Sequence, residues 1–190
     1  FVEVELLLLE VPEKVWNQQK MGEYLIRFPP APGPEQEKFL QKIQRASGVR
    51  TFAQEKKQIP LGEPGIYNFP FKKAPLEGEP AGYFFNVTPV AVIGGIIELN
   101  IVIQFKEVPE KDKDDAILKP KNIYEMPLRT DLAIRNGEVS LLQGAAREGK
   151  KKGNKIYYLI CIRPTVDAST DIVQPMDTGR KFKWKHPWKE

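Results

Sequence analysis

The chain lacks the residues from which most catalytic and metal sites are built. It has 190 residues but only one cysteine, Cys161, and one histidine, His186. These counts exclude a disulfide within the chain and a zinc site made of Cys and His clusters. They also disfavour Ser-His-Asp and Cys-His catalytic sets, which leaves carboxylates, lysines and tyrosines. No pair of carboxylates stands out, so we expect no enzymatic activity, no metal and no cofactor.

Long apolar runs are missing as well. The most apolar stretch, Phe1 to Val11, is interrupted by Glu3, Glu5 and Glu10, and it stays well short of the roughly 18 residues of a membrane-spanning helix. The sequence opens without Met or a basic leader, so we expect any signal peptide or upstream domain to lie outside it. The 17 prolines are nearly twice the usual share of about 5%, which argues against a mainly helical protein.

Positive charge is concentrated in two short stretches. Residues 147–155 and residues 180–190 each hold five Lys or Arg against one Glu, which is +4 apiece. Since the whole chain is +4, the remainder is 4 − 8 = −4. A mildly acidic body argues against a face that binds duplex nucleic acid, and we expect no nucleic-acid partner.

Hydrophobic periodicity predicts a mainly β fold, β-rich α+β, with one principal helix. Pro34 at a first helical position, Glu35 and Glu37 in the first turn and Gly48 after the last periodic residue predict a helix over 34–47. The opening run to Val11 predicts a strand that becomes buried on both faces. From Pro12 to Pro34 we expect only weak structure.

Long antiparallel hairpins follow the helix. A period of two leads toward Gly94-Gly95 from Tyr83 and away from it to Phe105. A second hairpin is expected around Asn136-Gly137, a favoured two-residue turn, and a third around the basic loop that ends at Lys155. The apolar second-face residues of the strands at 97–105 and 156–162 predict that both faces are covered, by a second sheet, a neighbouring subunit or lipid. The charged segment from Val108 to Lys121 predicts a solvated loop.

The order of these segments resembles the conserved domain of the secretins of bacterial type II and III secretion systems. The segments are GVRTFAQ after the helix, GYFFNVTPVAVIGGIIELNIVIQF, MPLRTDLAIRNGEVSLLQGAARE and IYYLICIRP. The matching positions are Val2, Val4, Glu5, Glu10, Val11, Val49, Arg50, Thr51, Gly82, Phe85, Val87, Thr88, Pro89, Val90, Gly95, Ile97, Leu99, Ile101, Thr130, Leu132, Ile134, Asn136, Gly137, Val139, Leu141, Gly144, Ile162 and Pro164.

The resemblance covers residues 1–164, which we expect to form a secretin-like β-domain, with 165–190 as a basic and aromatic tail. It implies a homo-oligomer in the bacterial cell envelope, in the periplasm or outer membrane, with other envelope or secretion proteins as partners. Only about 30 residues separate Phe52 from Gly82, and a short basic loop stands where the family has its last gate segment. The resemblance therefore implies the fold and ring assembly, and does not by itself imply a gated channel.

Two groups of residues are candidates for contacts with another subunit or with lipid. One is the basic loop, whose simpler interpretation is a hairpin tip kept soluble by lysines. The other is the aromatic tail, which we expect to dock on protein, because exposed aromatic area is unfavourable at roughly 25 cal/mol per Å². The residues are Lys150, Lys151, Lys152, Lys155, Phe182, Trp184 and Trp188.

Two functions of different kinds are consistent with this pattern. The first is a non-enzymatic structural component of a secretin-like ring that supports secretion or transport. The alternative is a stand-alone all-β module that binds a peptide or glycan through exposed aromatic residues such as Tyr67, Phe69, Phe71 and Trp184. A ring of many subunits would favour the first function and a monomer the second.

Overall fold

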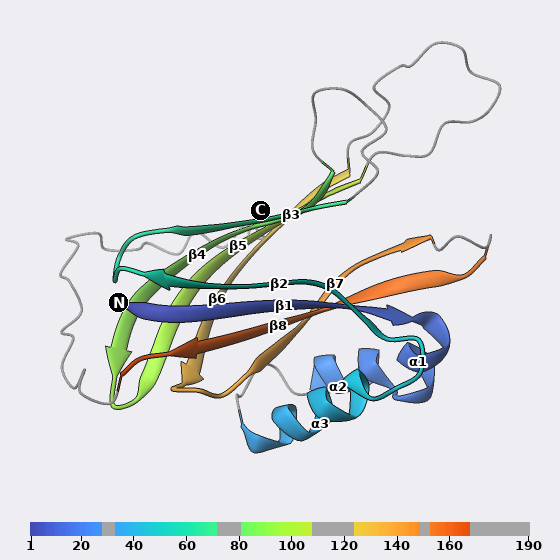
Figure 1. Cartoon of the computed structure of the whole chain (residues 1–190), viewed down its shortest axis with the longest axis horizontal. Helices are drawn as coiled ribbons and strands as arrows, with labels where there is room; N and C mark the ends of the chain where they lie inside the picture. Colours follow the sequence, from blue (N-terminus) through green and yellow to red (C-terminus); the bar gives the residue numbers. More distant parts are fainter. Residues whose placement is uncertain (28–32, 72–80, 108–123, 149–152, 168–190) are drawn as a thin grey trace, which may run out of the picture.

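The computed structural model describes residues 1–27, 33–71, 81–107, 124–148 and 153–167 (Figure 1). In this part of the chain, two four-stranded antiparallel sheets pack together and three helices lie against one of them. The mainly β prediction is confirmed. The expected boundary at 164/165 stays a prediction, since the segment from 168 to 190 lies outside the described residues.

Each sheet has its own share of the chain. The first sheet has the strand order β2-β1-β8-β7, with β2 Arg50–Ile59, β1 Val2–Pro12, β8 Lys155–Thr165 and β7 Ser140–Glu148. The second sheet has the order β3-β4-β5-β6, with β3 Gly65–Pro70, β4 Gly82–Ile93, β5 Ile96–Glu107 and β6 Tyr124–Arg135. The second sheet is a continuous meander, whereas the first joins the two ends of the chain.

The main core lies between the two sheets. Aliphatic side chains from alternate positions of β1 and β5 meet there, because successive residues of a strand point to opposite faces. Aromatic side chains contribute to the same core, and two of their hydroxyls donate to backbone carbonyls of the first sheet. Tyr67 donates to Val4 at 2.7 Å, and Tyr83 donates to Ala145 at 3.0 Å.

A second core lies on the other face of the first sheet, beneath the helices α1 Glu13–Gln18, α2 Met21–Arg27 and α3 Pro34–Gln44. Figure 1 shows these helices gathered on one side of that sheet. Trp16 stacks on Tyr157 with ring centroids 4.6 Å apart. Leu40 and Ile43 of α3 are buried in the same cluster. The first sheet is thus covered on both faces, as its opening run predicts.

The helix predicted over 34–47 is confirmed as α3, with Pro34 in its first turn. It ends earlier than predicted, at Gln44, and Gly48 has a φ of 86°, the left-handed conformation expected of a glycine after a helix. The short helices α1 and α2 replace the weak structure expected between Pro12 and Pro34. At six and seven residues they are too short to show a helical period, and packing on β8 and β7 stabilises them.

The first predicted hairpin is confirmed: Ile93 pairs with Ile96 across Gly94 and Gly95. The third is confirmed as the β7–β8 pair, with Glu148 opposite Lys155. The charged loop from Val108 to Lys121 is outside the described residues.

The second predicted hairpin is wrong. The strands β6 and β7 on either side of Asn136-Gly137 lie in different sheets. Asn136 donates its backbone N–H to Gly95 of the second sheet at 2.8 Å, while Gly137 donates to Pro164 of the first sheet at 2.9 Å. Asn136 also exchanges two side-chain hydrogen bonds with the backbone of Val166. The dipeptide is therefore a corner between the sheets, although Gly137 does have the positive φ, 79°, that its sequence predicts.

The predicted coverage of both faces is confirmed for β8. For β5 it stays a prediction, because a neighbouring subunit or lipid was among the covers predicted. Residues 158–162 of β8 are all buried. On β5 the second face carries Glu98, Asn100, Val102 and Gln104, none of which is buried, and no described element covers it.

Candidate functional site

Of the predicted contact residues, the structure describes only Lys155. Lys155 is exposed at the start of β8, where its backbone N–H lies 3.4 Å from a carboxylate oxygen of Glu13. Lys150, Lys151 and Lys152 lie outside the described residues, as do Phe182, Trp184 and Trp188. Their assignment as subunit or lipid contacts stays a prediction.

The aromatic residues offered for a peptide or glycan site are not exposed. Tyr67, Phe69 and Phe71 all point into the core between the sheets. They belong to β3 and the residue after it, a strand that the sequence did not indicate because it is short and ends in Pro70. Burial raises the pKa of Tyr67 above its usual value. This part of the binding-module hypothesis is wrong, and Trp184 lies outside the described residues.

No cluster of three or more His, Cys, Asp or Glu side chains that could hold a metal occurs among the described residues. In the same part of the chain, no helix is long and apolar enough to cross a membrane. Cys161 is buried beneath the helices, and burial raises the pKa of its thiol. A thiol with a raised pKa is a poor nucleophile.

Glu10, at the far end of β1, is the best buried carboxylate among the described residues, with 8% of its surface exposed. It accepts hydrogen bonds from Arg50 and Arg147, each at 3.0 Å, and from the Tyr158 hydroxyl at 3.2 Å. The Arg147 guanidinium also lies 4.6 Å from the centre of the Phe71 ring. Since both carboxylate oxygens are bonded, this cluster ties β1, β2, β7 and β8 together rather than offering a free base.

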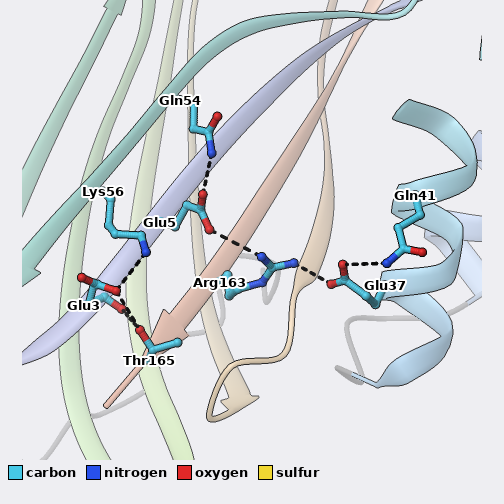
Figure 2. A network of polar contacts seen from close by, with 8 residues as sticks. All are labelled: Glu3, Glu5, Glu37, Gln41, Gln54, Lys56, Arg163 and Thr165. Carbon is cyan, nitrogen blue, oxygen red and sulfur yellow. Dashed lines mark hydrogen bonds and ion pairs between the residues drawn. The ribbon is translucent and has the colours of Figure 1, made fainter. Parts of the chain in front are cut away.

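A polar network joins α3 to the first sheet (Figure 2). Arg163 of β8 lies between two carboxylates, with its guanidinium 2.6 Å from Glu37 of α3 and 3.6 Å from Glu5 of β1. Gln54 and Gln41 donate to the same two carboxylates. The network lines a shallow groove of about 140 Å³, whose size and paired charges fit a structural latch better than a binding pocket.

The four sheet edges differ in how well they are protected. On β7, the buried side chain of Gln36 accepts the outward N–H of Leu141 at 2.9 Å, so α3 covers that edge. On β3, the Lys57 ammonium bonds to the outward carbonyl of Ile66, and Pro70 has no N–H to offer. The edge of β2 carries three consecutive charged residues, Glu55, Lys56 and Lys57. Charged side chains, proline and a covering helix are the usual means of blocking an edge.

The edge of β6 also carries charged residues and Pro127, but within the described residues no helix covers it and no side chain bonds to the outward backbone groups of residues 129–133. The Gly94-Gly95 turn has φ of 57° and 76°, as a type I′ turn requires, and its flanking residue Ile96 is hydrogen-bonded to Ile93 of β4. Backbone groups alternate in direction along an antiparallel strand. Therefore Ile97, and every second residue after it, bonds to β6.

The partners of these β5 residues in β6 are the even-numbered ones, from Ile134 back to Leu128. The odd-numbered residues Arg129, Asp131 and Ala133 consequently direct their N–H and C=O groups away from the sheet. Their side chains lie exposed on the outer face, and Leu128 on the inner face is 44% exposed. This 12-residue strand, paired on one side only, is the candidate functional surface.

Comparison with known proteins gives structural matches only. No protein-family model matches the chain. No curated protein is similar to it in sequence. The solved structures that resemble it include secretins of type II and type III secretion systems.

Three of these structures show the extent of the likeness. The type II secretin GspD from enteropathogenic Escherichia coli is 14% identical, and the match covers 86% of this chain and 68% of that chain at a TM-score of 0.43. The InvG secretin domain β-barrel of the Salmonella SPI-1 injectisome is 15% identical, and the match covers 93% of this chain and 64% of that chain at a TM-score of 0.40. The secretin XcpQ from Pseudomonas aeruginosa is 12% identical, and the match covers 86% of this chain and 55% of that chain at a TM-score of 0.31. The chain spans at most about two thirds of these secretins.

Proposed function

We propose that the protein is a non-enzymatic structural component of a homo-oligomeric ring in the bacterial cell envelope, where it supports secretion or transport. The observation that carries this proposal is the open edge of β6. A row of unpaired backbone donors and acceptors on a long edge strand is a template for pairing with another chain. A closed ring removes such edges, because the last subunit pairs with the first.

The second sheet is suited to side-by-side assembly. In a sheet of four antiparallel strands, the first strand, β3, runs opposite to the last, β6. Copies placed side by side in the same orientation would therefore join β6 of one to β3 of the next as another antiparallel pair. Lys57 would have to release the carbonyl of Ile66 for this pairing to form.

The envelope location and the role in secretion come from the hairpin motifs of the sequence. The same resemblance supports other envelope or secretion proteins as partners and contact with the outer membrane. Within the described residues, the carboxylates of Glu10, Glu5 and Glu37 are bonded to arginines, which favours a structural role over an enzymatic one.

Native mass and imaging of the full chain in mild detergent test the proposal, with rings of many subunits as the expected result. Cysteines placed at Ile66 on β3 and Ala133 on β6 sharpen it, because a short crosslinker with two thiol-reactive groups should then join copies into a ladder. Cys161 is buried and should contribute no background. The matched control pairs Ala133→Cys with Asn86→Cys, an exposed position on the inner strand β4. A monomer that yields no ladder would contradict ring assembly.

A further inference from the structure

The open edge of β6 carries a charge pattern that complements itself. Along the outward-facing row, Arg129 is followed by Asp131 and then Ala133. Suppose that β6 of a second copy lies antiparallel beside it, with Thr130 opposite Thr130. Arg129 then faces Asp131 of the other copy, and Asp131 faces the other Arg129, so that both ion pairs form at once.

The backbone agrees with this register. Arg129 and Asp131 both direct their N–H and C=O groups outward, so each Arg129–Asp131 pair would exchange two backbone hydrogen bonds. Pro127, which has no N–H, falls opposite Ala133, where its carbonyl can still accept. On the inner face, the exposed Leu128 would gain Leu132 of the other copy as its neighbour.

Neighbouring registers are disfavoured by the same charges. A shift that keeps the outward groups facing each other moves the pairing by two residues. It then places Arg129 opposite Arg129, or Asp131 opposite Asp131, and like charges directly opposite each other are destabilising. The charge pattern therefore selects one register and one symmetric partner, a second copy of this chain.

We propose that two copies pair through β6 around a twofold axis at Thr130, and that this dimer occupies the edge that ring assembly needs. The pairing is a property of the edge itself, while its role as a brake on assembly rests on the proposed function. A twofold contact uses the same surface on both copies and closes upon itself, so it cannot grow into a ring. Ring formation would then require the dimer to open.

Sedimentation velocity of the full chain over a range of concentrations tests the pairing. We expect the unaltered chain to dimerise and Arg129→Asp to raise the dissociation constant at least about tenfold, since two attractive pairs become two repulsive ones. The double variant Arg129→Asp with Asp131→Arg restores both pairs in reversed order and should dimerise again. It also keeps the original net charge. Lys14→Asp, exposed on α1, changes the net charge as Arg129→Asp does and should leave dimerisation unchanged.

Equal dimerisation of Arg129→Asp and the unaltered chain, or failure of the folded double variant to dimerise, would overturn the pairing. Unfolding midpoints of all variants show whether each is folded. Amide hydrogen exchange gives a second readout at the edge itself. The amides of Arg129, Asp131 and Ala133 should be protected only at concentrations where the dimer forms, and protection at every concentration would contradict the proposal.

Native mass of the full chain in mild detergent tests separately whether the β6 dimer limits assembly and whether the chain forms rings. If Arg129→Asp gives more large assemblies than the unaltered chain and the double variant gives fewer than Arg129→Asp, the brake is supported. If all variants assemble equally, the brake is wrong. If no variant assembles while the dimer still follows the charge pattern, the pairing stands and the proposed ring is wrong.

Discussion

The two sheets of this protein differ in what covers their outer faces. Helices pack on the outer face of the first sheet, and its central strands β1 and β8 are apolar on both sides. The second sheet shares one face with the first and leaves the other without a cover in the described part of the chain. The first sheet is thus complete within one chain, whereas the second retains a face and an edge on which another molecule can pair. The burial of single residues reflects this difference. Residues 158–162 of β8 are all buried, whereas buried and less buried residues alternate along β5.

The largest expected effect comes from the covered face of the first sheet. Leu159→Ala, on the face beneath the helices, should lower the free energy of unfolding by about 2–5 kcal/mol because it leaves a cavity. Val102→Ala, on the bare face of the second sheet, should cost less than about 1 kcal/mol. Urea unfolding measures both. Ile160→Ala and Ile101→Ala, one residue away and facing the shared core, serve as controls that should both be severe.

The next effect distinguishes a covered edge from an open one. Gln36→Leu removes the acceptor of the Leu141 N–H and should cost about 1–3 kcal/mol, the usual cost of an unsatisfied buried donor. Gln41→Leu, on the exposed side of the same helix, should stay within about 0.5 kcal/mol. Chemical unfolding of the two variants gives the difference. Equal stability would mean that α3 does not protect the β7 edge.

A smaller loss is expected where the two sheets are joined. Gly137→Val forces a β-branched residue into a positive φ and should cost about 1–2 kcal/mol or slightly more. Gly33→Val is the matched control, since Gly33 is extended and an added side chain there would meet no other atom. Thermal melting compares them. A Gly137 variant as stable as the Gly33 variant would show that the corner tolerates another conformation. The sequence also predicts a milder effect for Gly149→Val, at a position outside the described residues.

The smallest effect concerns the latch between helix and sheet. Arg163→Met leaves Glu5 and Glu37 without their shared cation and should cost about 1 kcal/mol, because the pair is partly exposed and screened by solvent. Lys56→Met, which breaks the more exposed contact with Glu3, should cost less than about 0.5 kcal/mol. Unfolding in low and high salt tests both values. A loss for Lys56→Met that equals the loss for Arg163→Met would contradict the latch.

Several elements of the fold could be predicted from local pattern. The run through Leu6 and Leu9 has too few polar residues for a strand with an exposed face, so burial on both sides follows. Gly94-Gly95 between two alternating runs predicts a hairpin because both residues adopt positive φ at no steric cost. Likewise Pro34 and Gly48 mark the limits of α3 to within a few residues.

The errors arise where distant parts of the chain decide. Asn136-Gly137 has the composition of a tight turn, yet the partner of β6 is β5, and the partner of β7 is β8. A dipeptide fixes a local change of direction and does not choose which strand pairs next. Tyr67 and Phe69 were expected to be exposed because β3 is too short for a clear alternation, and only the opposing sheet shows that they are buried.

The candidate edge was not predicted as a site because its signal depends on which strands pair. Arg129 and Asp131 become significant only when β6 is known to be the last strand of its sheet. The predicted lysines and tryptophans were instead chosen by composition. A basic and aromatic composition indicates a tendency to bind, but it does not show where a partner binds.

The pairing of β1 with β8 has a consequence for the order in which the protein can fold. These two strands form the centre of the first sheet, and their contact between Glu10 and Tyr158 joins residues 148 positions apart in sequence. The second sheet, by contrast, pairs neighbours along the chain and has far less loop entropy to overcome. During synthesis the second sheet can therefore form before β8 has been made and can pair with β1. Until the last strand emerges, the apolar β1 has neither neighbour nor cover on that side, and the growing chain is then most prone to aggregate.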